Sequence, residues 1–283
     1  MSVGYPMKSL EVGQKRYEFN TMKKNVVFML NIDMGNNRNT PYHYSINSWK
    51  KWCKDNDIFF FELNELIADP NDLHVNVQKW WALDVLELNL KGKYDQVCVV
   101  DADTIIHPDS PNFFDLTDNE FCAVNDNGSF EWVLRSINGW GDSLFPNQKK
   151  INIWEYWNSG FVVYSRKHLE YINSIQKFFM ENNKNIEKYR KIIKASSDQT
   201  ICNYILESET LKVKLLPECW NLQHLFKKDL LHFPNYSWWE DKLLFLDAGY
   251  IYHFNGIPNW PQFIDRPMGY WMERTYRELY DNK

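Results

Sequence analysis

Short apolar segments alternate with amphipathic helical patterns in the first part of the chain, and this alternation constrains the fold more than any other feature. Apolar segments rich in valine and phenylalanine occupy residues 25–32, 58–62 and 96–100, and their length favours strands over helices. Between them, residues 46–53 and 77–88 carry apolar side chains at three- and four-residue intervals, which predicts helices. This order predicts parallel strands joined by right-handed crossovers.

The second part of the chain lacks this regularity. We expect strands at residues 121–124, 161–164, 211–215 and 250–254, and helices at residues 172–179, 186–193, 198–207 and 272–279. Residues 125–153 contain clusters of Gly, Asn and Pro, so we expect a loop-rich binding insertion there instead of a core element. Together the two parts predict one α/β domain with a mixed central sheet.

Composition and charge exclude several classes of protein. The net charge is −5, whereas a general nucleic-acid-binding protein needs a basic surface. No apolar stretch is long enough to cross a membrane, so we expect no membrane span. The first 25 residues lack the apolar segment of a secretory signal, and the five cysteines have no metal-binding spacing. We therefore expect a cytoplasmic protein with reduced thiols.

The segment VCVVDADTIIHP places two carboxylates directly after a buried strand. Asp101 and Asp103 stand two residues apart where that strand ends. In open α/β sheets, ligands bind at the carboxyl ends of strands, and carboxylate oxygens suit Mg²⁺ and Mn²⁺. A cation held there would neutralise a diphosphate leaving group. The alternative interpretation of the same pattern is a solvated turn.

Three later segments complete a recognisable series. They are WNSGFVVY (157–164), SDQTICNY (197–204) and IYHFNG (251–256). With the Asp-x-Asp segment, in this order, they resemble the metal-dependent GT-A glycosyltransferases. The resemblance is strongest to the retaining, glycogenin-like family 8 enzymes and the lipopolysaccharide galactosyltransferases, with family 34 next, and it extends from about residue 25 to residue 260.

The resemblance implies a domain organisation. A GT-A-type single domain would span residues 25–265, with a Rossmann-like nucleotide-binding half at 25–124 and an irregular acceptor-binding half at 125–265. An N-terminal extension, 1–24, would precede it, and a C-terminal helix, 266–283, would follow it.

The resemblance also implies a metal centre. Asp101 and Asp103 match the acids that hold Mn²⁺ or Mg²⁺ on the donor diphosphate, and Ala102 lies between them on the donor side. His253 matches the third protein ligand, and Gly256 would let diphosphate oxygens approach the backbone. Taken alone, His253 would be interpreted as a buried histidine with ordinary hydrogen-bond partners.

The implied catalytic residues lie in the two middle segments. Asn158 matches a residue that contacts the donor sugar or the acceptor, and Asp198 and Gln199 match the catalytic pair beside the transferred sugar. Helix capping through Ser197 and Asp198 is the alternative. The chain departs from the family pattern at Thr200, where a second acid is expected.

A second departure affects the phosphate site. The family 8 pattern HxxGxxK would place a phosphate-binding lysine at Asn259. Lys79, on the helix before the Asp-x-Asp strand, is close to the place where the family carries a basic residue, so we expect it to take the phosphate role. A solvated lysine on a helix face is the alternative.

Further binding residues follow from position and side-chain chemistry. Asn31 and Asp33 follow the first strand, where the base and ribose of the donor should lie. Asp126 is placed to reach hydroxyl groups of the sugar or the acceptor. Trp157 and Trp220 are candidates for stacking on sugar rings.

The predicted function is glycosyl transfer, of the hexosyltransferase type, from a nucleotide sugar such as a UDP-sugar. The acceptor would be a glycan, a lipid-linked molecule or a protein. Two alternatives remain at this point. A haloacid-dehalogenase-type phosphatase would use Asp101 as its nucleophile, although its motif normally opens the fold. A sugar-nucleotide-binding protein without turnover is the non-enzymatic alternative, favoured by the departures at Thr200 and Asn259.

Overall fold

The computed structural model describes residues 25–231, 243–257 and 267–281. The expected N-terminal extension, 1–24, and Asn259 lie outside the described residues.

A mixed sheet forms the centre of the molecule. Its strands are β1 (Asn25–Leu30), β2 (Phe59–Leu63), β3 (Gln96–Val100), β5 (Cys122–Asn125), β6 (Trp157–Ser165) and β7 (Lys214–Leu216). The order across this six-stranded sheet is β2-β1-β3-β6-β5-β7. β1 is parallel to β2 and β3, β6 is antiparallel to β3 and β5, and β7 is parallel to β5. The predicted parallel half and mixed sheet are thereby confirmed.

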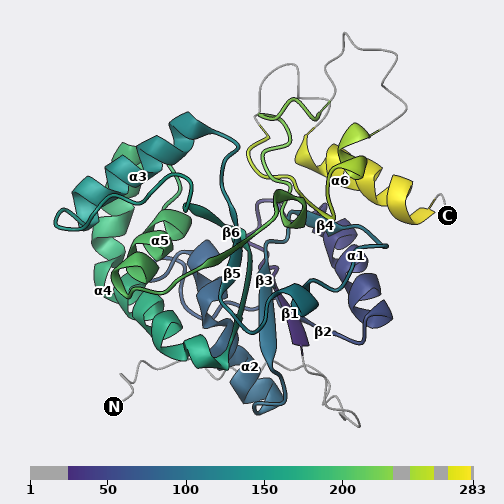
Figure 1. Cartoon of the computed structure of the whole chain (residues 1–283), viewed down its shortest axis with the longest axis horizontal. Coiled ribbons are helices and arrows are strands. Elements are labelled where there is room, and N and C mark those ends of the chain that lie inside the picture. The colour runs from purple at the N-terminus through teal and green to yellow at the C-terminus, as the bar shows by residue number, and fades with distance from the viewer. Residues whose placement is uncertain (1–24, 232–242, 258–266, 282–283) are drawn as a thin grey trace.

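Helices cover both faces of this sheet. They are α1 (Tyr42–Asp55), α2 (Ala82–Leu90), α3 (Phe130–Leu144), α4 (Leu169–Ile193), α5 (Asp198–Ser208) and α6 (Met268–Tyr276). Shorter helical turns are η1 (Val75–Trp81), η2 (Phe113–Leu116), η3 (Arg166–His168), η4 (Glu218–Trp220), η6 (Leu244–Asp247) and the π-helical η8 (Arg277–Asp281). Figure 1 shows α3, α4 and α5 together on one side of the strands, and α1 and α6 on the other.

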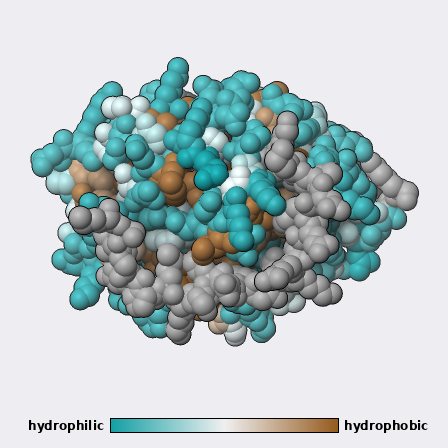
Figure 2. Space-filling model, turned by 90° about the horizontal axis from the view of Figure 1, so that it is seen from below, coloured by the Kyte–Doolittle hydropathy of each residue, from teal (hydrophilic) through white to brown (hydrophobic). Residues whose placement is uncertain are grey.

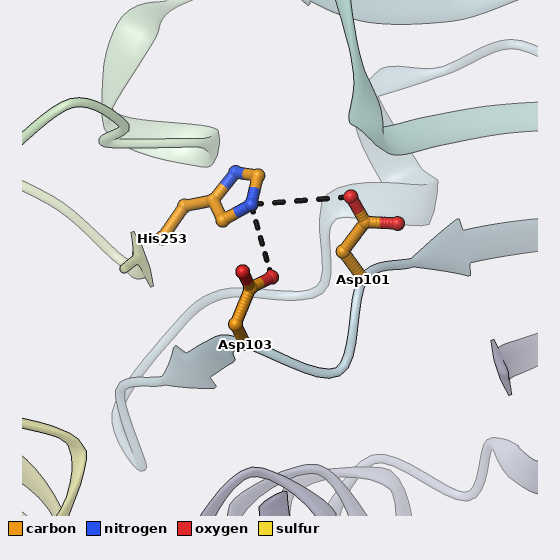
Figure 3. Close-up of side chains that lie close together, drawn as sticks. All are labelled: Asp101, Asp103 and His253. Atoms are coloured by element: carbon orange, nitrogen blue, oxygen red, sulfur yellow. Dashed lines mark ion pairs between the residues drawn. The ribbon is translucent and has the colours of Figure 1, made fainter. Parts of the chain in front are cut away.

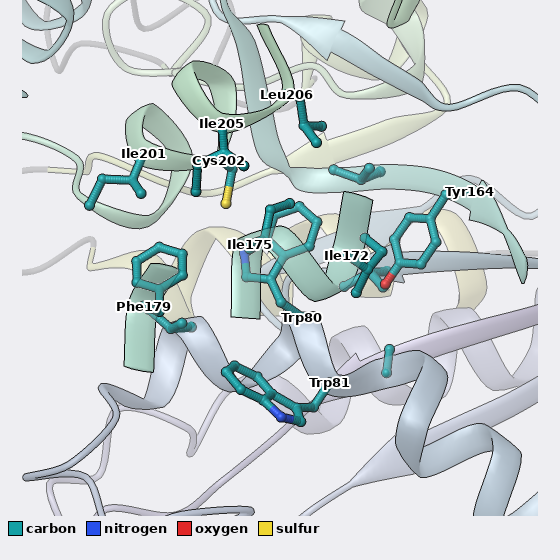
Figure 4. Packing of buried hydrophobic residues seen from close by; sticks show 14 of the residues in the cluster. Trp80, Trp81, Tyr164, Ile172, Ile175, Phe179, Ile201, Cys202, Ile205 and Leu206 are labelled. Carbon is teal, nitrogen blue, oxygen red and sulfur yellow. The ribbon is translucent and has the colours of Figure 1, made fainter. Parts of the chain in front are cut away.

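The alternation of side chains along the strands explains these two layers. Val26 and Phe28 of β1 pack in the cluster that includes η1, α2, α4 and α5, whereas Val27 and Met29 pack in the cluster that includes α1. Because both faces are buried, the strand sequence is continuously apolar, as parallel strands require. Figure 4 shows the first cluster, with Trp80 among aliphatic side chains of α4 and α5.

A second, two-stranded sheet brings the end of the chain to the middle of the fold. β4 (Thr104–Ile106) follows β3 after a short turn and pairs antiparallel with β8 (Ile251–His253). In this register Thr104 stands opposite His253. The backbone N–H of Phe254 donates to the carbonyl of Asp103 at 2.9 Å. This pairing sets a late histidine beside the Asp-x-Asp turn.

Residues 125–153 are not a loop-rich insertion throughout, which corrects that expectation. α3 occupies Phe130–Leu144. Val133, Ile137 and Trp140 are buried at helical spacing. Asn138, Gly139 and Gly141, which suggested a turn, lie on this helix, whereas the Gly and Asn residues of 125–128 precede it.

Two other expectations differ in extent. The helices expected at 172–179 and 186–193 are one continuous helix, α4, because the polar residues between them lie on its outer surface. The strand expected at 211–215 is shorter and shifted, since β7 spans only Lys214–Leu216.

Figure 2 shows hydrophobic side chains in separate patches between hydrophilic ones on the face that it presents. Among the described residues, the helices include none with the length and apolar composition needed to cross a membrane.

Candidate active site

The Asp-x-Asp turn is held rigidly where β3 ends. The backbone N–H of Asp101 donates to the carbonyl of Gly160 on β6 at 3.0 Å. The hydroxyl of Thr104 donates to the carbonyl of Asp101 at 2.7 Å and accepts the indole N–H of Trp49 at 3.0 Å. Neighbouring strands and α1 therefore hold the backbone of the turn in place at Asp101.

Asp101, Asp103 and His253 converge, as Figure 3 shows. His253 Nε2 lies 3.2 Å from Asp103 Oδ1 and 4.0 Å from Asp101 Oδ2. One ligand atom from each residue lies within 4.8 Å of the other two. Two carboxylate oxygens and one imidazole nitrogen form a donor set that suits a divalent cation such as Mn²⁺, so the residues present fit the implied metal.

Electrostatics within this cluster favour bound positive charge. Burial alone lowers the pKa of His253, but the charge and hydrogen bond of Asp103, with the charge of Asp101, raise it above its ordinary value. Burial raises the pKa of Asp103, whereas the charge and hydrogen bond of His253 lower it overall. The two carboxylates thus stabilise a proton on His253 Nε2, at a position that a cation would also favour.

A glycine makes room for the cluster. A Cβ atom at Gly160 would lie 2.3 Å from His253 Cε1 and 2.9 Å from Asp101 Oδ2. Real Cβ atoms do not approach other atoms so closely, so any side chain at this position would displace the ring or the carboxylate. The NSG sequence on β6 therefore has a role in the site beyond that of Asn158.

The ammonium group of Lys79 is already fully engaged. Lys79 Nζ donates to Asp101 Oδ1 at 2.8 Å, to the carbonyl of Ser159 at 2.9 Å and to Ser159 Oγ at 3.2 Å. It also lies 3.6 Å from Asp198 Oδ2. Burial lowers its pKa, but Asp101 and Asp198 raise it to about 12. These partners use its three donors, so binding a phosphate would require Lys79 to leave them.

Asp198 and Gln199, at the start of α5, lie beside the NSG segment. Ser159 Oγ donates to Asp198 Oδ2 at 3.1 Å. Gln199 Oε1 accepts Asn158 Nδ2 at 2.9 Å. The structure therefore brings the expected sugar-side residues together, next to Lys79 and the metal cluster. Thr200, where the family pattern has an acid, bonds instead to the hydroxyl of Tyr156 at 2.7 Å.

A buried amide connects the histidine of the cluster to this group. His253 Nδ1 donates to Asn221 Oδ1 at 3.1 Å, and Asn221 Nδ2 donates to Asn158 Oδ1 at 3.0 Å. Because Oδ1 of Asn221 can only accept, the proton of the neutral ring lies on Nδ1 and the Nε2 lone pair faces the acids. Sequence reasoning missed Asn221, whose only signal is the segment CWNLQH, in which three polar side chains follow a tryptophan shortly after β7.

Asp126 is enclosed by donors. Asp126 Oδ2 accepts Gln199 Nε2 at 2.7 Å and Asn158 Nδ2 at 3.4 Å, and its Oδ1 lies 2.9 Å from His224 Nε2. Burial raises its pKa, but the hydrogen bond and charge of His224, then the bonds of Gln199 and Asn158, lower it overall. Asp126 is 1% exposed, so in this arrangement it positions Asn158 and Gln199 rather than facing solvent. His224 is a second residue that sequence reasoning missed.

The remaining predicted residues differ in exposure. Trp157 and Trp220 are 2% and 4% exposed and pack in the core, so stacking on a sugar would first require them to be uncovered. Gly256 is exposed in the turn after β8, with a φ of +68° that favours glycine.

A cavity of about 320 Å³ opens beside Asp101, Ala102 and Asp103. Its other lining residues come from the end of β1, the following loop, α1 and the segment around η1: Leu30, Ile32, Met34, Asn36, Arg38, Asn39, Tyr42, Pro70, His74, Val75, Asn76 and Lys79. Asn31 and Asp33 are not among them. Asn31 instead donates to Glu62 at 3.0 Å, and Asp33 accepts the backbone N–H of Gly35 at 2.8 Å.

The fold is a single α/β domain of the GT-A type, with its acidic turn at the end of a central strand. The chain is similar to the crystal structure of a glycosyltransferase involved in the glycosylation of the major capsid of PBCV-1. The TM-score is 0.54 and the identity 9%, over 89% of this chain and 99% of that chain. At this identity, the likeness establishes a shared fold.

Two further structures are more distant. The apo structure of the bifunctional glycosyltransferase WbbM has a TM-score of 0.48 and 16% identity, over 94% of this chain and 52% of that chain. Mouse xyloside xylosyltransferase 1 has a TM-score of 0.44 and 10% identity, over 83% of this chain and all of that one (100%). No family model and no curated protein sequence matches the chain. These comparisons do not assign the chain to family 8 or family 34.

Proposed function

We propose that this protein is a metal-dependent glycosyltransferase that moves a sugar, such as a hexose, from a nucleotide sugar to an acceptor hydroxyl. The observation that carries the proposal is the convergence of Asp101, Asp103 and His253 beside a cavity at the carboxyl ends of β1 and β3. In open α/β sheets this is where nucleotides bind. The glycosyltransferase fold of a solved structure supports the same conclusion.

In this proposal, three groups of residues have separate roles. Asp101, Asp103 and His253 would hold the cation, which when bound supplies charge neutralisation to the departing diphosphate. Lys79 holds Asp101 and Asp198 in fixed positions through its ammonium group. Asn158 and Gln199, fixed by Asp126, would orient the transferred sugar.

The stereochemistry of transfer is a separate part of the proposal. We expect retention, with the leaving phosphate accepting the proton of the acceptor hydroxyl as the bond between sugar and phosphate breaks. Asp198 and Gln199 would then stabilise the positive charge that develops on the sugar. NMR of the anomeric proton of the product decides this point, and an inverted product would reject it.

The direct test is a panel of UDP-, GDP- and ADP-sugars with Mn²⁺, in which released nucleotide is measured. Wild type should release nucleotide from at least one donor, and EDTA should abolish the release. Asp103→Ala should lose turnover and metal-dependent donor binding, because a ligand atom is removed. Asp115→Ala removes an exposed aspartate that does not line the cavity and should leave both unchanged. His253→Ala should weaken metal binding less than Asp103→Ala.

The same panel separates the alternatives. A phosphatase with Asp101 as nucleophile would hydrolyse p-nitrophenyl phosphate and ignore nucleotide sugars. It would have no need for an imidazole between the two acids, as His253 is placed here. A protein without turnover would bind a nucleotide sugar in the presence of Mn²⁺ and release nothing with any acceptor tested.

A further inference from the structure

The two cationic side chains that line the cavity beside the Asp-x-Asp turn differ in how fully other groups engage them. Two permanently cationic side chains line it, Arg38 and Lys79. Lys79 Nζ donates its hydrogen bonds to Asp101 and Ser159, as described above. The positive charge of Lys79 is therefore balanced by the carboxylates of Asp101 and Asp198, and its ammonium group is poorly available to a ligand.

Arg38 differs from Lys79 in having free donors. It lies on the loop after β1, and its Nε donates to the hydroxyl of Tyr42 at 3.2 Å. Among the described residues, no carboxylate forms an ion pair with its guanidinium group. Tyr42 first, and then the carboxylates of Asp103 and Asp101, raise the pKa of Arg38. Among the described residues, the guanidinium group of Arg38 thus has no carboxylate partner. It lines the same cavity as Asp101 and Asp103.

A guanidinium group matches phosphate oxygens with parallel N–H donors and keeps its charge at every physiological pH. The sequence HFNGIPNW offers no lysine after His253. We propose that Arg38 binds the diphosphate of the nucleotide donor and supplies the positive charge that Lys79 cannot. This inference rests on the proposed function.

The placement of Arg38 predicts that its replacement changes the affinity for two ligands, Mn²⁺ alone and a nucleoside diphosphate, in opposite directions. With Mn²⁺ alone, the guanidinium repels the ion across the cavity, so Arg38→Gln should bind Mn²⁺ as tightly as wild type or more tightly. With a nucleoside diphosphate in saturating Mn²⁺, the same variant should lose the attraction and the hydrogen bonds to phosphate. A variant that merely disturbed the fold would weaken both ligands.

Isothermal titration calorimetry tests this with Mn²⁺ alone and, in saturating Mn²⁺, with UDP, GDP and ADP and the matching monophosphates and nucleosides. For the diphosphate that wild type binds most tightly, Arg38→Gln should bind about 10- to 100-fold more weakly. The matching nucleoside should change by less than about threefold. Arg38→Lys should recover part of the loss, since it keeps the charge without the planar fork. Arg135→Gln, an exposed arginine on α3 paired with Glu131, is the control.

Three outcomes would overturn the inference. If wild type binds no nucleoside diphosphate in Mn²⁺, both the proposed function and the role of Arg38 are wrong. If wild type binds one and Arg38→Gln binds it within twofold, only the role of Arg38 is wrong. If the variant loses diphosphate and nucleoside equally, Arg38 shapes the cavity instead of binding phosphate.

Discussion

At the scale of single residues, the orientation of one imidazole depends on one buried amide. Asn221 is fully buried, and its Oδ1 accepts a hydrogen bond from the N–H at His253 Nδ1. This bond keeps Nε2 directed at Asp101 and Asp103, so that in the neutral ring its lone pair faces them. Gly160 completes the arrangement by leaving space for the ring. Neither residue belongs to the group of Asp101, Asp103 and His253, yet both determine where the ring of His253 lies.

Asn221→Leu should therefore weaken Mn²⁺ binding by about 10- to 100-fold while leaving all three expected ligands in place. The apolar side chain cannot accept the Nδ1 proton, so the ring loses its fixed tautomer and direction. Binding of Mn²⁺, measured by electron paramagnetic resonance, checks this. Asn221→Asp keeps an acceptor oxygen and should retain more affinity than the leucine variant. Equal affinity of wild type and Asn221→Leu, with unchanged circular dichroism, would contradict the role of Asn221.

At the scale of elements, the sequence predicts those parts of the fold whose burial is uniform. The apolar segments of β1, β2 and β3 are buried or partly buried along their length, with no exposed residue, so composition alone identifies them. α3 was missed because Gly139 and Gly141 are also typical of turns. Packing overrides that local preference: a Cβ at Gly139 would lie 2.7 Å from Ile193 of α4. Glycine permits two helices to approach closely, which a sequence pattern does not reveal.

The capping box of η3, the turn that leads into α4, should make the stability of the protein depend on pH. His168 Nδ1 accepts the backbone N–H of Ser165 at 3.1 Å in a capping box. Burial, and then the charge of Lys167, lower the pKa of His168 to about 4. The folded state thus favours the neutral ring. Its contribution is fully present above the ordinary pKa of about 6.5 and is lost as the pH falls towards 4.

Between pH 7 and pH 5, the free energy of unfolding should therefore fall by about 1 to 2 kcal/mol more in wild type than in His168→Gln. Glutamine keeps an oxygen that can accept the same N–H but does not titrate. Urea unfolding followed by circular dichroism at both pH values measures the difference. Parallel decreases in the two proteins would show that His168 does not titrate as described.

At the scale of the whole molecule, the candidate metal site joins two sheets. Asp101 follows β3 of the central sheet, whereas His253 ends β8 of the two-stranded sheet. The sequence identified these residues because carboxylates at a strand end and a late histidine are local patterns. It could not identify Asn221, His224 or Arg38. Their roles depend on contacts between segments that are distant in the chain.

Binding of Mn²⁺ should thus stabilise the two-stranded sheet of β4 and β8, and its position beside the central sheet, against local unfolding. Hydrogen exchange at the amides of β4 and β8 should slow when Mn²⁺ is added, because local opening of that pair would separate the ligands. At a concentration about 100 times the Kd, the ion should add about 2.7 kcal/mol of stability. The melting temperature should rise by about 5 °C. Asp103→Ala should show neither effect, and slowed exchange in that variant would place the ion elsewhere.

The pairing of β4 with β8 also has a consequence for biosynthesis. A ribosome that has made both acids of the turn must add 150 further residues, from position 103 to position 253, before it reaches the imidazole opposite Thr104. A nascent chain therefore exposes two clustered carboxylates without the strand that completes their surroundings. The candidate cation site can therefore be completed only after the segment that contains β8 has been synthesised.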